Sequence, residues 1–270
     1  MIFASQVPPL AHLLTLESSQ RLISYVYTRE HRDGGFTITP LSPPTISDTF
    51  YAVRILELLG QVDGLESTKE YIARIDGGIS PRAKVRYHLA YLRRRFGLSP
   101  RNSSPPSSGW AEDLEDAFFW QKIRHLEGHN FFWSGKAGDR VFYPPELPRA
   151  YTMKDLYYYL DLQPHLPPEK ITTWLNWVQA CQAPDGGFGF RPGTTSFMDN
   201  VLPAVKILTK FRRFPIRLPH LVQFIQGCQT KSGGFARKGG GVAFLESSYQ
   251  AVMVLRLLSA LPEEVLSGVN

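Results

Sequence analysis

The sequence has few cysteines, no long apolar run and no alternating strand pattern. Each of these features argues against a class of fold or site. Its two cysteines, Cys181 and Cys228, are more typical of small buried residues than of a disulfide or a metal site. No apolar run approaches the roughly 18 residues that a membrane-spanning helix needs. Residues 1–20 contain no basic segment, so they make a poor signal peptide. We therefore expect a soluble, cytoplasmic protein without a transmembrane segment.

Several binding signatures are missing as well. The run Gly239–Gly241 has neither the strand nor the flanking residues of a phosphate-binding loop. The net charge of +6 would suit an anionic ligand, an acidic membrane surface or nucleic acid, without choosing among them. The basic run Arg93–Arg95 stands at the end of an expected helix, where positive charge complements the helix dipole. Nothing in the pattern indicates nucleic-acid recognition, so we expect no nucleic-acid partner.

One sequence pattern occurs twice near the end of the chain. Residues 177–188 read WVQACQAPDGGF, and residues 224–235, 47 positions later, read FIQGCQTKSGGF. Each Gly-Gly-Phe is followed by a loop, by an acidic residue thirteen positions after the first glycine (Asp199, Glu246), and by an apolar helical run. A repeat of this length indicates one supersecondary unit copied along the chain.

Weaker copies of the unit precede this pair. Gly34-Gly35 and Gly77-Gly78 mark two of them. The five expected repeats lie near residues 22–60, 68–97, 111–163, 171–211 and 220–261. Because no alternating pattern persists, we expect an all-α chain in which each repeat is a hairpin of one outer and one inner helix. Such hairpins bury their apolar faces only against their neighbours, so 1–270 is expected to form a single domain.

The acidic residues that follow the loops have a structural interpretation. Asp48 stands where the N-cap of a helix is expected, and Gly60 where the same helix should end. Asp199 and Glu246 open their helices in a similar way. Helix initiation therefore explains all three carboxylates without a catalytic role.

The Gln-x-x-x-Gly-Gly-Phe signal and the helix start DTFYAVRILELLG resemble a known family. They are similar to the repeats of protein prenyltransferase β-subunits and of squalene and terpene cyclases, which share the α-α toroid fold. The resemblance is strongest at 22–60 and 171–261 and weaker at 61–165. It implies a barrel of inner helices, closed or open, whose apolar cavity holds an isoprenoid.

Aromatic residues near the starts of expected helices are compatible with such a cavity. Phe118, Phe119, Tyr157 and Tyr158 would line it. The same side chains would equally serve to fill the core of the barrel. The resemblance also leaves room for a partner, either a helical subunit such as the protein prenyltransferases use or a second copy of the chain.

The zinc site of the protein prenyltransferases is not repeated here. In that family the metal activates a thiol and is held by an Asp-x-Cys and a histidine. The corresponding residues of this chain are Asp199-Asn200-Val201 and Tyr249. One ligand of three remains, so zinc is not expected. For a zinc-independent reaction, Asp199 and Tyr249 are the catalytic candidates.

The resemblance also points to a diphosphate-binding region. Arg191 matches the arginine that follows Gly-Gly-Phe in the family, whereas Thr194 replaces a lysine. Arg237 and Lys238 follow the last Gly-Gly-Phe and add positive charge. Guanidinium groups suit phosphate because their planar fork donates two hydrogen bonds. Alternatively, all three are solvated surface charges. Mg²⁺ would be the compatible ion for a diphosphate substrate, and no other cofactor is expected.

A third motif resembles the acid of the cyclases. The segment Asp113-Leu114-Glu115-Asp116 places Glu115 where the cyclases carry their proton donor. Acidic residues are also common dipole partners in the first turn of a helix. Three functions stay open: a prenyltransferase-like protein that binds a prenyl diphosphate, a non-catalytic scaffold that binds lipid or protein, and a minimal class II terpene cyclase that uses Glu115.

Overall fold

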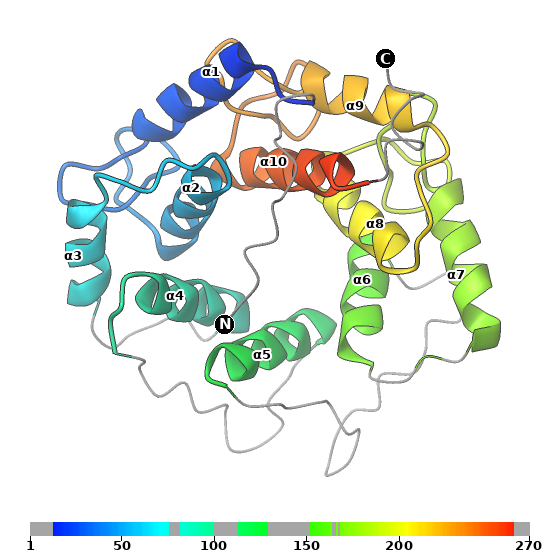
Figure 1. Cartoon of the computed structure of the whole chain (residues 1–270), viewed down its shortest axis with the longest axis horizontal. Helices are drawn as coiled ribbons and strands as arrows, with labels where there is room; N and C mark the ends of the chain where they lie inside the picture. Colours follow the sequence, from blue (N-terminus) through cyan, green and yellow to red (C-terminus); the bar gives the residue numbers. More distant parts are fainter. Residues whose placement is uncertain are drawn as a thin grey trace. The chain divides into compact units, whose positions relative to one another are not determined.

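A computed structural model describes residues 13–75, 82–99, 113–128, 152–163, 166 and 168–261 of the chain. Their regular structure is helical, with isolated β-bridges and no strand in the described ranges (Figure 1). The helices are α1 (Leu16–Tyr27), α2 (Ile46–Leu58), α3 (Glu66–Arg74), α4 (Ala83–Arg95), α5 (Leu114–Leu126), α6 (Met153–Leu162), α7 (Pro168–Ala180), α8 (Met198–Lys210), α9 (Leu218–Gly227) and α10 (Leu245–Ser259). The expected all-α class is confirmed.

Contacts divide the chain into two compact units. The first unit combines Met1–Thr28, Ile55–Gly60 and Leu175–Asn270. The second unit combines Arg29–Arg54 and Gln61–Trp174. In the first unit, α8 packs on α10. In the second unit, α4 packs on α5, α5 on α6, and α3 on α4.

The start of α2 differs from the expectation by three residues. The hydroxyl of Thr45 accepts a hydrogen bond from the amide of Asp48 (3.0 Å) and donates one to its carboxylate (2.7 Å). Thr45 is therefore the cap, in an arrangement related to the capping box, and Asp48 is the third residue of the helix. The prediction that Asp48 is the N-cap is wrong because the preceding threonine offers the earlier cap. Gly60 does follow the end of α2 with a φ of +73°, as expected.

The Gly-Gly-Phe turn is closed by the same bridge in its three described copies. An isolated bridge pairs Phe36 with Glu30, Phe188 with Gln182, and Phe235 with Gln229. The first glycine of each turn has a positive φ, between 86° and 95°. The turn at Gly77-Gly78 lies outside the described residues. Each turn sets the direction in which the polypeptide enters the loop and the helix that follow it.

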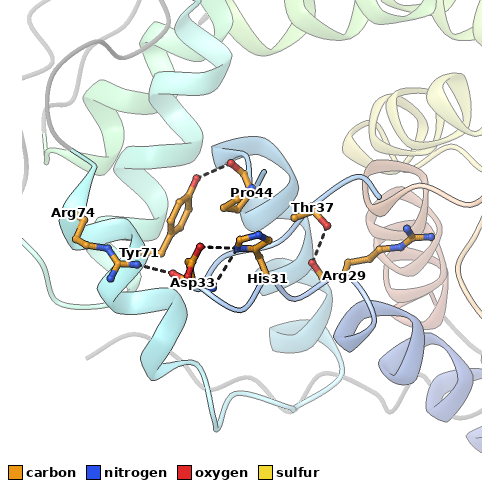
Figure 2. A network of polar contacts seen from close by, with 7 residues as sticks. All are labelled: Arg29, His31, Asp33, Thr37, Pro44, Tyr71 and Arg74. Atoms are coloured by element: carbon orange, nitrogen blue, oxygen red, sulfur yellow. Dashed lines mark hydrogen bonds and ion pairs between the residues drawn. The ribbon is translucent and has the colours of Figure 1, made fainter. Parts of the chain in front are cut away.

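Each turn packs against a helix of another repeat. Figure 2 shows the first one, where Arg74 of α3 donates to the carbonyl of Asp33 (2.6 Å) and Tyr71 donates to the carbonyl of Pro44 (3.1 Å). A Cβ added at Gly34 would stand 2.1 Å from the carbonyl oxygen of Ser67. Glycine is required here because the turn touches the backbone of α3.

In the last two repeats, the glutamine before the turn fastens a helix of another repeat. Gln182 donates to the carbonyl of Arg217, just before α9, and accepts from its amide (3.3 and 2.9 Å). Gln229 donates to the carbonyl of Ser18 in α1 and accepts from its hydroxyl (3.0 and 2.8 Å). Both glutamines also donate to the carbonyl of the first glycine of their own turn (2.9 Å). The glutamine of the Gln-x-x-x-Gly-Gly-Phe pattern therefore joins one repeat to another through hydrogen bonds of its side chain.

The expected repeat 111–163 has an unexpected arrangement. Its first helix, α5, packs along both α4 and α6 (Figure 1). It is therefore a lateral neighbour of α4, and it does not serve as an outer helix that covers α6 alone. The residues between α4 and α5, and between α5 and α6, lie mostly outside the described ranges.

Candidate functional site

The predicted site residues fall into two separate groups. Asp199, Arg237, Lys238, Tyr249 and Arg191 belong to the first unit, and Glu115 belongs to the second unit. Each group is therefore considered by itself.

Asp199 and Arg237 form an ion pair at the start of α8. A terminal nitrogen of Arg237 donates to Oδ2 of Asp199 at 2.5 Å. The carbonyl of Arg237 accepts from the amide of Met198 at 2.7 Å, so the loop after the last Gly-Gly-Phe is tied to the first residue of α8. Arg237 remains 55% exposed, whereas Asp199 is only 19% exposed. An anion that binds Arg237 would share the guanidinium with this carboxylate.

The ring of Phe197 lies near both Arg237 and Lys238. Its ring centroid lies 5.4 Å from the guanidinium carbon of Arg237 and 5.8 Å from Nζ of Lys238. Both cations thus sit within cation–π distance of one ring. The sequence predicted this basic pair but not the phenylalanine that gathers it. The signal was available, since Phe197 immediately precedes the helix that Asp199 opens.

Arg191 lies on a loop that closes on itself. Its amide donates to the hydroxyl of Thr194 (3.2 Å), and that hydroxyl donates to the carbonyl of Arg191 (2.8 Å). Thr194 therefore closes the turn. The guanidinium lies 5.8 Å from the ring of Phe190, and its Nε is buried without a hydrogen-bond partner among the described residues. Tyr249 is half-buried on α10.

The second unit contains a continuous row of rings. We call these residues the aromatic row: Phe50, Tyr51, Tyr87, His88, Tyr91, Phe118, Phe119, Tyr157 and Tyr158. Its members come from α2, α4, α5 and α6. Neighbouring helices are joined by pairs such as Phe50–Tyr91 (5.3 Å) and Tyr87–Phe119 (5.5 Å).

The sequence predicted only part of this row. Phe118, Phe119, Tyr157 and Tyr158 were expected either to line a cavity or to fill the core, and Phe118 contacts the other three. The members on α2 and α4 were missed. Tyr87 and Tyr91, four positions apart, carried the available signal, because residues at this spacing share one face of a helix.

The fold and the turns agree with a comparison against protein families. The model of the prenyltransferase alpha-alpha toroid domain matches residues 7–77 and 151–269, well over half of the chain. The chain belongs to this toroid family. A search of curated proteins finds no match. The part of the toroid outside the matched ranges includes α4 and α5, and with them Glu115 and much of the aromatic row.

The residues of this toroid do not fit the zinc ion of the protein prenyltransferases. Val201 is the fourth residue of α8, and the fourth residues of α2 and α10 are Thr49 and Ser248. Their hydroxyls accept from the amides of the turn phenylalanines (3.0 and 2.8 Å), so this position faces the backbone of the turn. Val201 is fully buried there and offers no ligand atom. Within the described ranges, no three His, Cys, Asp or Glu residues lie close enough to hold a metal.

Neither cysteine supplies the missing thiolate. Cys181 and Cys228 are 1% exposed. Burial raises the pKa of each thiol to about 12. Both therefore stay protonated at neutral pH, which makes them poor ligands and poor nucleophiles.

The carboxylates around Glu115 all have structural partners. Asp113 caps α5 by accepting from the amide of Asp116 (2.9 Å). Asp116 accepts from the amide of Ala83 (3.3 Å), and Glu115 accepts from the hydroxyl of Tyr158 (2.8 Å). In this arrangement Glu115 links α5 to α6 as a hydrogen-bond acceptor. A cyclase acid must instead donate a proton.

Among the helices that the structure describes, none has both the length and the apolar character needed to cross a membrane.

Proposed function

We propose that this toroid binds an isoprenoid, and that the aromatic row is the surface that receives the isoprenoid chain. The observation that carries the proposal is the unbroken contact of rings from four helices in the second unit. Aromatic side chains offer a large apolar contact area at little conformational cost. A branched hydrocarbon is the ligand that such a surface suits.

Cations already lie on this row. The guanidinium carbon of Arg54 is 4.9 Å from the ring centroid of Tyr91, and Nζ of Lys122 is 5.0 Å from that of Phe118. Rings that attract a guanidinium or an ammonium group also stabilise an allylic cation. Ionisation of a prenyl diphosphate produces such a cation, so the row supports transfer as well as binding.

Independently of the aromatic row, we propose that Arg237 and Lys238 of the first unit bind a diphosphate group, with Arg191 as a third cation. Arg237 and Lys238 are exposed and lie beside one ring, and Mg²⁺ is the ion we expect with them. Transfer would proceed without zinc and to an acceptor other than a thiolate. Asp199 and Tyr249 are the polar groups proposed to assist it.

A non-catalytic scaffold is the second candidate, and one observation favours it. The predicted anion-binding arginine, Arg237, is already neutralised by Asp199. A toroid without catalytic activity does not need a guanidinium that is free to bind an anion, so it can keep the ion pair between Arg237 and Asp199. The minimal cyclase is the third candidate, and it requires Glu115 to give up its bond to Tyr158.

Native mass spectrometry with farnesyl diphosphate and farnesol tests the proposal. We expect one molecule of either ligand per chain, because both carry the isoprenoid. Tyr87→Leu should weaken the binding of both by about fivefold, since an aromatic contact contributes roughly 1 kcal/mol. Phe96→Leu, at the other end of α4, is the matched control and should bind normally. Arg237→Gln should leave farnesol binding unchanged and weaken the binding of inorganic diphosphate, which tests the cations of the first unit by themselves. A chain that binds neither ligand would support the scaffold.

A further inference from the structure

The turns reveal which residues correspond between repeats. The carbonyl of the turn phenylalanine accepts from the amide nine positions later in each case: Phe36 from Thr45, Phe188 from Phe197, and Phe235 from Phe244 (3.1 Å each). The next residue begins α2, α8 or α10. The second residue of these helices is therefore a true counterpart across the repeats.

Ser47 is this counterpart in the first repeat. The other two repeats carry carboxylates there, Asp199 and Glu246. Asp48 is the nearest acid in the sequence of the first repeat, but the hydrogen bonds place it one residue beyond the corresponding position. The first repeat thus presents a hydroxyl where the others present an acid.

Ser47 meets a histidine from α4. Its Oγ lies 3.1 Å from Nδ1 of His88, across 41 residues of sequence and within the second unit. Ser47 is half-buried. His88 is only 2% exposed. A hydroxyl and an imidazole at this distance have the geometry of a nucleophile and its base.

The aromatic row fixes the imidazole. Phe50 stacks on it, with centroids 4.1 Å apart and planes 9° apart. Tyr51 and Phe119 meet it edge-on at 5.2 and 6.2 Å. Stacking sets the plane of the ring, and therefore keeps Nδ1 directed at Ser47. Nδ1 can take a proton when the imidazole is neutral.

We propose that Ser47 is a nucleophile activated by His88, and that it acts on carboxylic esters with an apolar acyl group. The hydroxyl oxygen of Ser47 attacks the carbonyl carbon while its proton passes to Nδ1 of His88. The carbon–oxygen bond to the alcohol then breaks, and His88 returns the proton to the departing oxygen. Water attacks the acyl-serine with His88 as base, which releases the acid and restores Ser47. The rings around the pair select the apolar acyl group.

This activity does not depend on isoprenoid binding. The histidine stands on α4, outside the ranges that match the toroid family, so the pair is a feature of this chain's own sequence. The serine, by contrast, stands within the matched range. The family's properties therefore neither supply the pair nor exclude it.

A fluorophosphonate with a long alkyl chain tests the proposal directly. In the reaction, Oγ of Ser47 bonds to phosphorus, fluoride leaves, and His88 takes the proton. We expect one adduct per chain, located on Ser47 by peptide mass spectrometry, and none on Ser47→Ala. Ser42→Ala, in the loop that precedes α2, is the matched control and should label at the wild-type rate. His88→Gln should slow labelling by about 100-fold, the contribution typical of a positioned base.

Two results would overturn the proposal. The first is a folded wild-type chain whose Ser47 stays unmodified while the probe remains intact. The second is equal labelling of Ser47 in native protein and in 6 M urea, which would show that the fold does not activate it. The urea comparison uses the wild-type chain, so it decides the matter even if His88→Gln fails to fold.

Discussion

At the scale of single residues, the glycines of the turns are the least replaceable positions. A Cβ at Gly186 would stand 2.1 Å from the backbone of His220, and the φ of this glycine is +87°. Gly193 also has a positive φ, +77°, but an added Cβ would meet nothing within 4 Å. Comparing substitutions at these two glycines therefore separates the cost of backbone strain from the cost of a steric clash.

We predict that Gly193→Ala lowers the free energy of unfolding by about 1 kcal/mol, the cost of a left-handed conformation. Gly186→Ala should lower it by about 3 kcal/mol or more, because α9 must also move. Urea denaturation followed by circular dichroism measures both. Equal losses of the free energy of unfolding would contradict the prediction. They would mean that the turn at Gly186 accommodates a methyl group despite the nearby backbone of His220.

At the scale of helices and turns, the glutamines tie each turn to a particular helix. Gln229 bonds to Ser18 of α1, and Gln182 bonds to Arg217 at the start of α9. The two links have the same chemistry and different targets. Substituting one of them should therefore loosen one helix and leave the other as a reference.

We predict that Gln229→Ala speeds amide hydrogen exchange in residues 16–27 and leaves residues 218–227 unchanged. Gln182→Ala should do the reverse. Each change leaves backbone groups unpaired, which costs roughly 1–3 kcal/mol of local stability. Exchange followed by mass spectrometry reports both segments in one experiment. Uniform acceleration across the chain would show that the glutamines stabilise the fold as a whole.

These links also show which contacts a sequence does not predict. The recurrence of glutamine, two glycines and phenylalanine was visible in the sequence and predicted the family, and the lack of an alternating strand pattern predicted the helical class. The partner of each glutamine was not visible, because it lies 35 residues later for Gln182 and 211 residues earlier for Gln229. The contact of Ser47 with His88 has the same origin. Nothing local in either segment predicts the other, since tertiary packing alone brings them together.

At the scale of the whole molecule, the turn glycines and the candidate site positions are constrained to different degrees. The joints are backbone contacts that leave no room for a side chain at the turn glycines, so these glycines are hard to replace. The site positions carry no such restriction. The resemblance aligns Val201 and Tyr249 with metal ligands of the protein prenyltransferases. Membership of the family therefore does not by itself predict that those ligands are kept.

The whole molecule should also lose stability in alkali, because folding keeps two thiols from ionising. The pKa of Cys181 and Cys228 rises from 9.0 to about 12 on burial. Above pH 9, the unfolded chain releases these protons while the folded chain retains them. The unfolded state then binds fewer protons, so the free energy of unfolding falls as pH rises from about 9 to 12.

We predict a loss of at most about 3 kcal/mol per pH unit from the two thiols together. Urea titrations at pH 7, 9 and 10.5 measure it, and the variant with Cys181→Ala and Cys228→Ala separates the thiols from tyrosine and lysine. The variant should be less stable at pH 7, because it leaves two small cavities, but its stability should fall less steeply with pH. If both proteins fall in parallel, the thiols already ionise in the folded state. They would then be available as nucleophiles after all.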